Sequence, residues 1–256
     1  MTVVHTADVP PRPVPNGLRV APMLGEQTGF DPLAQAVLEC PPGTRTQPFA
    51  VDGVQETMFV LSGRGRAHIG DDIHELEPET ALALPPGTEL ALETTGTEPL
   101  RIVAVRIPDP EPEAAPRHGP ALSRLAEQTA GQATAQREFR ILADPATGLS
   151  SATHFVGYIP TARAPDHYHH YDEVIYVLDG EGVMHAGADE RPLSAGSCIQ
   201  LPARTVHCLE NTGAAPMRVV AVFRPAGSPA EAYYPDGTPA YQGDNEDQLQ
   251  RRSQQP

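Results

Sequence analysis

The segment DHYHHYDEVIYVLDGEG, residues 166–182, places closely spaced histidines before an apolar run that ends at glycines. The run EVIYVL is rich in β-branched and aromatic residues, and this composition predicts a strand. Because alternate residues of a strand share a face, His167, His169 and Glu173 should point to one side. His170 should point to the other side. If the first face looks into a barrel, two imidazoles and one carboxylate meet at one point.

A second segment, GSCIQLPARTVHCLEN at 196–211, brings a further histidine from a different strand, after a turn that contains proline. Three neutral imidazoles and one carboxylate form a good ligand set for a divalent transition metal. In an octahedral site they would leave two positions open for a substrate or for O₂. The candidate metal ligands are therefore His167, His169, Glu173 and His207.

The spacing of these residues resembles the two motifs of the cupin family, G(x)5HxH(x)3-4E(x)6G and G(x)5PxG(x)2H(x)3N. The first motif is matched by His167, His169, Glu173 and Gly180, and the second by Gly196, Pro202, His207 and Asn211. Two positions depart from the motifs, because Thr161 and Arg204 stand where glycine is usual. The resemblance covers residues 139–226. It implies a small β-barrel with the metal near its middle, held by the four candidate ligands, and a structural role for Asn211.

The chain repeats itself at a fixed offset of 117 residues. ETMFVLSGRGRAHIGDD, from Glu56, aligns with EVIYVLDGEGVMHAGAD, from Glu173. Residues 56–105 and 173–222 share 21 identities over 50 positions without a gap, so the unit is duplicated. Prolines and glycines, 29 and 22 in number, fall between short apolar runs. We therefore expect an all-β protein with two tandem cupin barrels of the jelly-roll type, joined by a linker with a short helix.

The first copy of the unit lacks most of the candidate ligands. Glu56 is retained, but Ala50 and Asp52 stand where the paired histidines should be. Leu90 replaces the third histidine, and Thr94 replaces the asparagine. This set would hold a transition metal poorly. One divalent metal per chain, Fe, Mn or Ni with Zn as a further option, is therefore expected in the second barrel.

The repeat also sets the expected division of the chain. The segment 107–137 opens with prolines and glutamates and then shows a helical pattern over about 120–130, ALSRLAEQTAG. The final segment contains two tyrosines that could dock, Tyr233 and Tyr234, before a polar and disordered end. The expected parts are an arm at 1–16, a metal-free barrel at 17–107, a linker at 108–137, a metal-binding barrel at 138–226 and a partly disordered tail at 227–256.

The composition limits the partners. The formal net charge is −15, from 33 acidic and 18 basic residues, which argues against nucleic acid or an anionic membrane as a partner. The first residues do not resemble a signal peptide, and no apolar run is long enough for a membrane helix. Three cysteines without a CxxC pair indicate reduced thiols in a cytoplasm. We expect a cytoplasmic homodimer that acts on a small molecule.

The ligand set resembles that of cupin dioxygenases, oxalate-degrading cupins and flavonol-cleaving cupins. This resemblance favours a metal-dependent oxidoreductase, most of all a dioxygenase, that acts on a small oxygenated organic molecule. One alternative is a non-redox isomerase, lyase or aminohydrolase, because GVQETMFVLSG and LALPPG resemble the first half of the (S)-ureidoglycine aminohydrolase family. That family uses a Glu, His, His and Gln set, which this chain lacks. A second alternative is a non-catalytic metabolite-binding protein.

Candidates for an acid–base group come from positions near the expected site. Tyr158 and Arg163 lie near the start of the metal-binding strand pair, and Gln200 lies on the strand before Pro202. Each of them could serve a catalytic role or a structural hydrogen bond.

Overall fold

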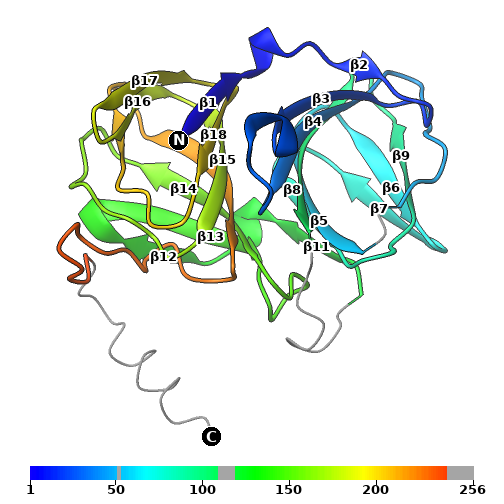
Figure 1. The fold of residues 1–256 in the computed structure, drawn as a ribbon. Helices are drawn as coiled ribbons and strands as arrows, with labels where there is room; N and C mark the ends of the chain where they lie inside the picture. Colours follow the sequence, from blue (N-terminus) through cyan, green and yellow to red (C-terminus); the bar gives the residue numbers. More distant parts are fainter. Residues whose placement is uncertain (51–52, 109–118, 241–256) are drawn as a thin grey trace, which may run out of the picture.

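A computed structural model of the chain describes residues 1–50, 53–108 and 119–240. It consists of two antiparallel β-barrels that lie side by side (Figure 1). Each barrel has a seven-stranded sheet and a three-stranded sheet. The all-β expectation and the expectation of two tandem barrels are both confirmed.

The two barrels repeat one strand order. The sheets of the N-terminal barrel have the orders β11-β8-β5-β10-β4-β3-β2 and β7-β6-β9, and those of the C-terminal barrel have the orders β1-β18-β15-β20-β14-β13-β12 and β17-β16-β19. The N-terminal barrel contains β2 (Arg12–Pro13), β3 (Arg19–Leu24), β4 (Ala34–Cys40), β5 (Val54–Ser62), β6 (Gly65–Ile69), β7 (Asp72–Leu76), β8 (Thr80–Leu84), β9 (Leu90–Thr94), β10 (Leu100–Pro108) and β11 (Ala121–Arg124). The C-terminal barrel contains β1 (Thr2–His5), β12 (Ala130–Ala133), β13 (Arg137–Ala143), β14 (Thr153–Ile159), β15 (Asp172–Asp179), β16 (Glu181–Ala186), β17 (Asp189–Ser194), β18 (Ser197–Leu201), β19 (Cys208–Asn211) and β20 (Met217–Arg224).

The barrels exchange their first strands. Strand β1 crosses to the C-terminal barrel and pairs antiparallel with β18, as the dark blue strand in Figure 1 shows. Strand β11, which precedes the second barrel in the chain, pairs with β8 of the N-terminal barrel. The N-terminal arm therefore adds a strand to the C-terminal barrel, and the linker adds a strand to the N-terminal barrel. Both strands lie at a sheet edge, where they satisfy main-chain groups that would otherwise be unpaired.

The helix suggested over about 120–130 is present only as a three-residue 3-10 helix, η3 (Leu125–Glu127). The residues before it, Ala121–Arg124, are extended because the edge of β8 supplies main-chain hydrogen bonds. Tertiary pairing therefore overrides the local helical preference. The remaining 3-10 helices are equally short, namely η1 (Thr6–Asp8), η2 (Glu26–Thr28) and η4 (Thr134–Gln136).

Both faces of β15 are buried, and this explains its continuous apolar run. Ile175 and Val177 belong to the core inside the C-terminal barrel. Val174 and Tyr176, which point the opposite way, belong to a core shared by the two barrels. An apolar strand without polar alternation is typical of a strand that is covered on both sides. Glu173 has the parity of Ile175 and therefore points into the barrel.

A buried hydrogen bond also links the barrels. The Nδ1 atom of His154 on β14 lies 2.7 Å from Oγ1 of Thr57 on β5. Because the Thr57 hydroxyl donates to the carbonyl of Leu82, the histidine must be the donor in this pair. Burial lowers the pKa of His154 to about 3, so the ring is neutral at pH 7.

Two further features of the described residues concern the expected thiol state and the expected lack of a membrane helix. All three cysteines are buried and free. No helix in the part of the chain that the structure describes has the length and apolarity needed to cross a membrane.

The buried His154 predicts a loss of stability in acid. Its pKa in the folded chain lies below the ordinary value of 6.5, so its contribution is complete above pH 6.5 and is lost as the pH falls toward 3. His154→Asn keeps a donor for Thr57 but does not titrate. We expect denaturant unfolding between pH 7 and pH 4 to show a shallower loss for this variant, by up to about 1.4 kcal/mol per pH unit. Parallel pH dependences for the variant and the unchanged chain would contradict this assignment.

Candidate metal centre

Main-chain pairing places two of the candidate ligands face to face. His167 lies just before β15, and His207 lies just before β19. The N–H of each residue donates to the carbonyl of the other, at 3.0 Å and 2.8 Å. A pair bonded in this way projects its two side chains to the same side. The segment 167–171 is not a continuous part of β15, yet the alternation expected for His167 and His169 is kept.

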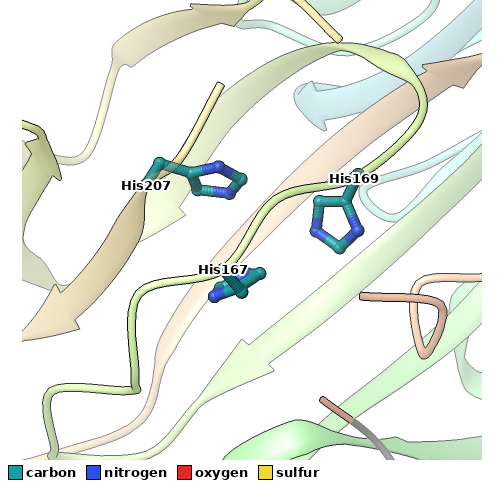
Figure 2. Close-up of side chains that lie close together, drawn as sticks. All are labelled: His167, His169 and His207. Atoms are coloured by element: carbon teal, nitrogen blue, oxygen red, sulfur yellow. The ribbon is translucent and has the colours of Figure 1, made fainter. Parts of the chain in front are cut away.

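The three histidine rings surround one point (Figure 2). Their centroids are separated by 4.7 to 5.5 Å. One nitrogen from each of His167, His169 and His207 lies within 4.8 Å of the other two, and this group could hold a metal ion. All three side chains are buried. His170 points elsewhere, as the strand alternation predicts, and its ring contacts Tyr168 and Tyr233.

A carbonyl oxygen fixes the tautomer of each of the three rings. The Nδ1 atom of His167 lies 2.9 Å from the carbonyl oxygen of Pro165, and that of His207 lies 2.8 Å from the carbonyl oxygen of Thr205. In His169 the partner is the carbonyl oxygen of Glu231, at 2.7 Å. A carbonyl oxygen only accepts, so each Nδ1 must carry the proton. Each Nε2 is therefore left with a lone pair for a metal.

Burial keeps these rings neutral. It lowers the pKa of His167 to about 3 and that of His169 to about 4, and it lowers the pKa of His207 well below the ordinary value. A metal competes with a proton for the same lone pair, so neutral rings are prepared to bind it.

Glu173, the fourth candidate ligand, lines the same cavity but is not one of the three donors that lie within 4.8 Å of one another. Its carboxyl group is buried, and this burial raises its pKa to about 8. The positive charge of Arg137 opposes part of that rise. The structure thus brings three of the four predicted ligands together and places the fourth in the wall of the same cavity.

The cavity is closed on one side by the tail of the chain. Pro229 and Ala232 line it, and the carbonyl of Glu231 binds His169. The carboxylate of Glu231 accepts hydrogen bonds from the hydroxyls of Tyr171 and Tyr233. Tyr233 also pairs through its main chain with Tyr168, so it docks as its sequence position suggests. The expected disordered end of the tail lies outside the described residues.

Sequence reasoning did not identify Glu231 as a partner of the site. Its contact with His169 is made by a main-chain carbonyl, which every residue carries, so no residue type could have signalled it.

The three acid–base candidates occupy different places. Tyr158 on β14 lines the cavity. Arg163 is exposed, lies 3.5 Å from Asp166 and does not line the cavity. Gln200 is paired with Val174, so its side chain points toward the other barrel, where it accepts a hydrogen bond from Thr28 at 2.6 Å. Tyr158 has the opposite strand parity to Phe155 and Ile159, and its side chain packs against the core shared by the two barrels.

The N-terminal barrel has no comparable donor group among the described residues. Leu90 is buried at the place of the third histidine, and Thr94 donates to the carbonyl of Cys40. Glu56 lies 3.7 Å from Arg106, which provides a counter-charge. Asp52 lies outside the described residues. A metal in this barrel would therefore have few ligands available.

Comparison with protein families identifies the fold. Residues 36–106 and 154–223 each match the model of the cupin domain, and together these matches cover more than half of the chain. The chain belongs to the cupin family. Because each match lies in one of the two barrels, the protein is a bicupin.

Solved structures resemble the bicupin over most of its length. Protein Ylba from E. coli is 13% identical with a TM-score of 0.73, covering 87% of this chain and 89% of that chain. AerE from Microcystis aeruginosa is 13% identical with a TM-score of 0.68, covering 84% and 97%. A variant of oxalate decarboxylase from Bacillus subtilis is 15% identical with a TM-score of 0.71, covering 88% and 78%. At these identities the likeness shows the fold alone. No curated protein sequence matches the bicupin.

Removal of one ring should abolish metal retention. We expect the purified bicupin to carry about one divalent metal per chain and His207→Ala to lose most of it, because two rings cannot replace three. His170→Ala is the matched control, since His170 lies outside the cavity. Elemental analysis after dialysis measures the content. Equal metal content in the two variants would rule out the assigned ligands.

Shortening the tail should weaken metal binding without a change in any ligand. A chain that ends at Gly227 lacks the carbonyl that orients His169, and we expect its metal affinity to fall roughly 10- to 100-fold. A chain that ends at Ala240 keeps the carbonyl and should bind like the full chain. Competition with a chromogenic chelator measures both affinities. If the two shortened chains bind the metal equally, the tail does not orient His169.

Proposed function

We propose that this bicupin is a metal-dependent enzyme that acts on a small oxygenated organic molecule. One divalent transition metal, Fe, Mn or Ni with Zn as a further option, would be held by His167, His169 and His207, with Glu173 as the fourth ligand. The observation that carries the proposal is the set of three neutral imidazoles whose Nδ1 protons are all bonded to carbonyl oxygens. Such bonding is typical of histidines that bind metals through Nε2.

The donor set fits a transition metal better than a hard cation. Neutral imidazoles suit Fe, Ni, Cu and Zn, whereas Ca²⁺ and Mg²⁺ prefer oxygen ligands. When bound, the metal would supply Lewis-acid activation and a template for the substrate. The chain itself would exclude water, because much of the cavity wall consists of apolar side chains such as Phe155, Ile175 and Phe223.

Oxidoreductase activity of the dioxygenase type is the reaction that we propose first. Three imidazoles and one carboxylate would leave coordination positions for both a substrate oxygen and O₂. One structural neighbour is by name an oxalate decarboxylase, and we propose a small oxygenated substrate for this chain as well.

A non-redox reaction is the second candidate, and the position of Glu173 favours it. The carboxyl group lies in the cavity but outside the group of three ring nitrogens. A buried carboxyl that does not bind the metal is free to act as a general acid or base. In that case the three histidines would hold the metal, and Glu173 would move a proton during isomerisation, elimination or hydrolysis.

Oxygen consumption distinguishes the two candidates. We expect the chain loaded with Fe²⁺ or Mn²⁺ to consume O₂ when a panel of small hydroxy and oxo compounds is supplied, and His207→Ala to show no uptake. An oxygen electrode measures the rate, and product analysis identifies the substrate. Full turnover of a substrate under anaerobic conditions would contradict the dioxygenase proposal and favour the non-redox reaction.

The assembly and location of the chain are also proposals. We propose a cytoplasmic homodimer with neither nucleic acid nor a membrane as a partner. Light scattering of the full chain tests the homodimer, and a mass equal to one chain would exclude it.

A further inference from the structure

Arg137 places a positive charge beside the metal centre. It is the first residue of β13 and follows η4, within the segment that the sequence assigns to the linker. The residue keeps some exposed surface, but its guanidinium is enclosed and it lines the cavity. The three histidines and Glu173 line the same cavity, so the guanidinium and the candidate ligands face one space.

The charge of Arg137 has no acidic partner at ion-pair distance among the described residues. Its Nη2 donates to the carbonyl oxygen of Leu209 at 2.6 Å, and the thiol of Cys208 is also near. A guanidinium has five N–H donors, so this carbonyl uses only part of its capacity. A largely enclosed cation with no acidic partner at ion-pair distance is unfavourable, and an anion in the cavity would relieve the cost.

The other charges of the cavity also favour an anion. Glu138 lines the cavity, but its carboxylate lies 3.5 Å from the guanidinium of Arg140. If Glu173 binds a divalent metal, its single negative charge is more than balanced by the ion. Arg137 then adds to an excess of positive charge in a low-dielectric space.

Thr134 offers a second polar group to the same space. Its hydroxyl oxygen is buried and has no hydrogen-bond partner in the structure. Thr134 belongs to η4, three residues before Arg137, and both residues line the cavity. A buried hydroxyl without a partner is costly and calls for a ligand or water in that place.

The size of the cavity limits the ligand. Its volume is about 70 Å³, and an apolar cavity of about 150 Å³ can hold a benzene ring. Only a molecule of a few heavy atoms therefore fits. Phe155, Val219 and Phe223 supply apolar contacts on other parts of the wall.

We propose that Arg137 and Thr134 bind the carboxylate group of a small organic acid whose neighbouring oxygen faces the three histidines. A planar carboxylate can accept two parallel hydrogen bonds from one guanidinium. A hydroxyl or oxo group on the adjacent carbon would then reach the metal. The proposal rests on the proposed function, because the hydroxyl or oxo oxygen of the ligand would have the metal as its partner. It names the substrate class as short 2-hydroxy- or 2-oxo-carboxylic acids.

Binding of glycolate to the Zn²⁺-loaded full chain tests this assignment. Ethylene glycol is the uncharged match, since a hydroxymethyl group replaces the carboxylate. Isothermal titration calorimetry gives the Kd of each, and elemental analysis gives the metal content of every variant. For Arg137→Gln we expect the Kd of glycolate to rise about 10- to 100-fold with unchanged metal content. For Thr134→Val a smaller rise is expected, and the weak binding of ethylene glycol should change in neither.

Arg163→Gln is the matched control, because Arg163 is an exposed arginine outside the cavity, and it should leave the Kd of glycolate unchanged. If Arg137→Gln does not fold, Arg137→Lys keeps the charge without the paired donors and should bind glycolate with intermediate strength. Unaltered glycolate binding in folded Arg137 variants, or no binding by the unchanged chain, would overturn the inference. Absence of metal from the unchanged chain would instead contradict the proposed function. If glycolate binding to that metal-free chain still depended on Arg137, the result would support the anion site alone.

Discussion

The candidate centre depends on one repeated interaction, the hydrogen bond from a histidine Nδ1 to a main-chain carbonyl. It occurs in all three rings, and it leaves all three Nε2 lone pairs available. Two of the carbonyls lie two residues before their histidines, so His167 and His207 orient themselves locally. His169 depends on a carbonyl from the tail, which makes the closure of the cavity part of the same arrangement. Burial then keeps the three rings neutral.

The strands around this arrangement are packed on both sides. Strand β15 is buried on both faces, with Ile175 in the core of its own barrel and Val174 in the core between the barrels. The reciprocal pairing of β1 with β18 and of β11 with β8 adds a second link between the two units. The N-terminal barrel thus covers and holds the strands that carry the centre, although among its described residues it has no comparable group of ligands.

Sequence patterns predicted the parts of this structure that rest on local chemistry. The duplication revealed two barrels, and strand alternation separated His169 from His170. The same reasoning placed Glu173 on the inner face but could not measure its distance from the three rings. The helical pattern over 120–130 was misleading, because pairing with β8 extends Ala121–Arg124. Long-range pairing of this kind is not encoded in a short segment.

Arg137 and Glu231 were missed for a different reason. Neither belongs to a recognisable motif: Arg137 opens β13 directly after η4, and Glu231 lies in the tail that follows the second barrel. Their roles emerge only when the chain brings η4 and the tail against the cavity. The two residues serve different parts of the site. Glu231 orients a histidine ring through its main-chain carbonyl, whereas Arg137 supplies a positive charge for a ligand.

The most direct test of the central claim is an anomalous difference map from crystals of the metal-loaded chain. The account predicts one strong peak per chain, in the C-terminal barrel, at about 2.0–2.3 Å from the Nε2 atoms of His167, His169 and His207. A peak bound through Nδ1, a peak in the N-terminal barrel, or no peak within reach of the three rings would contradict it.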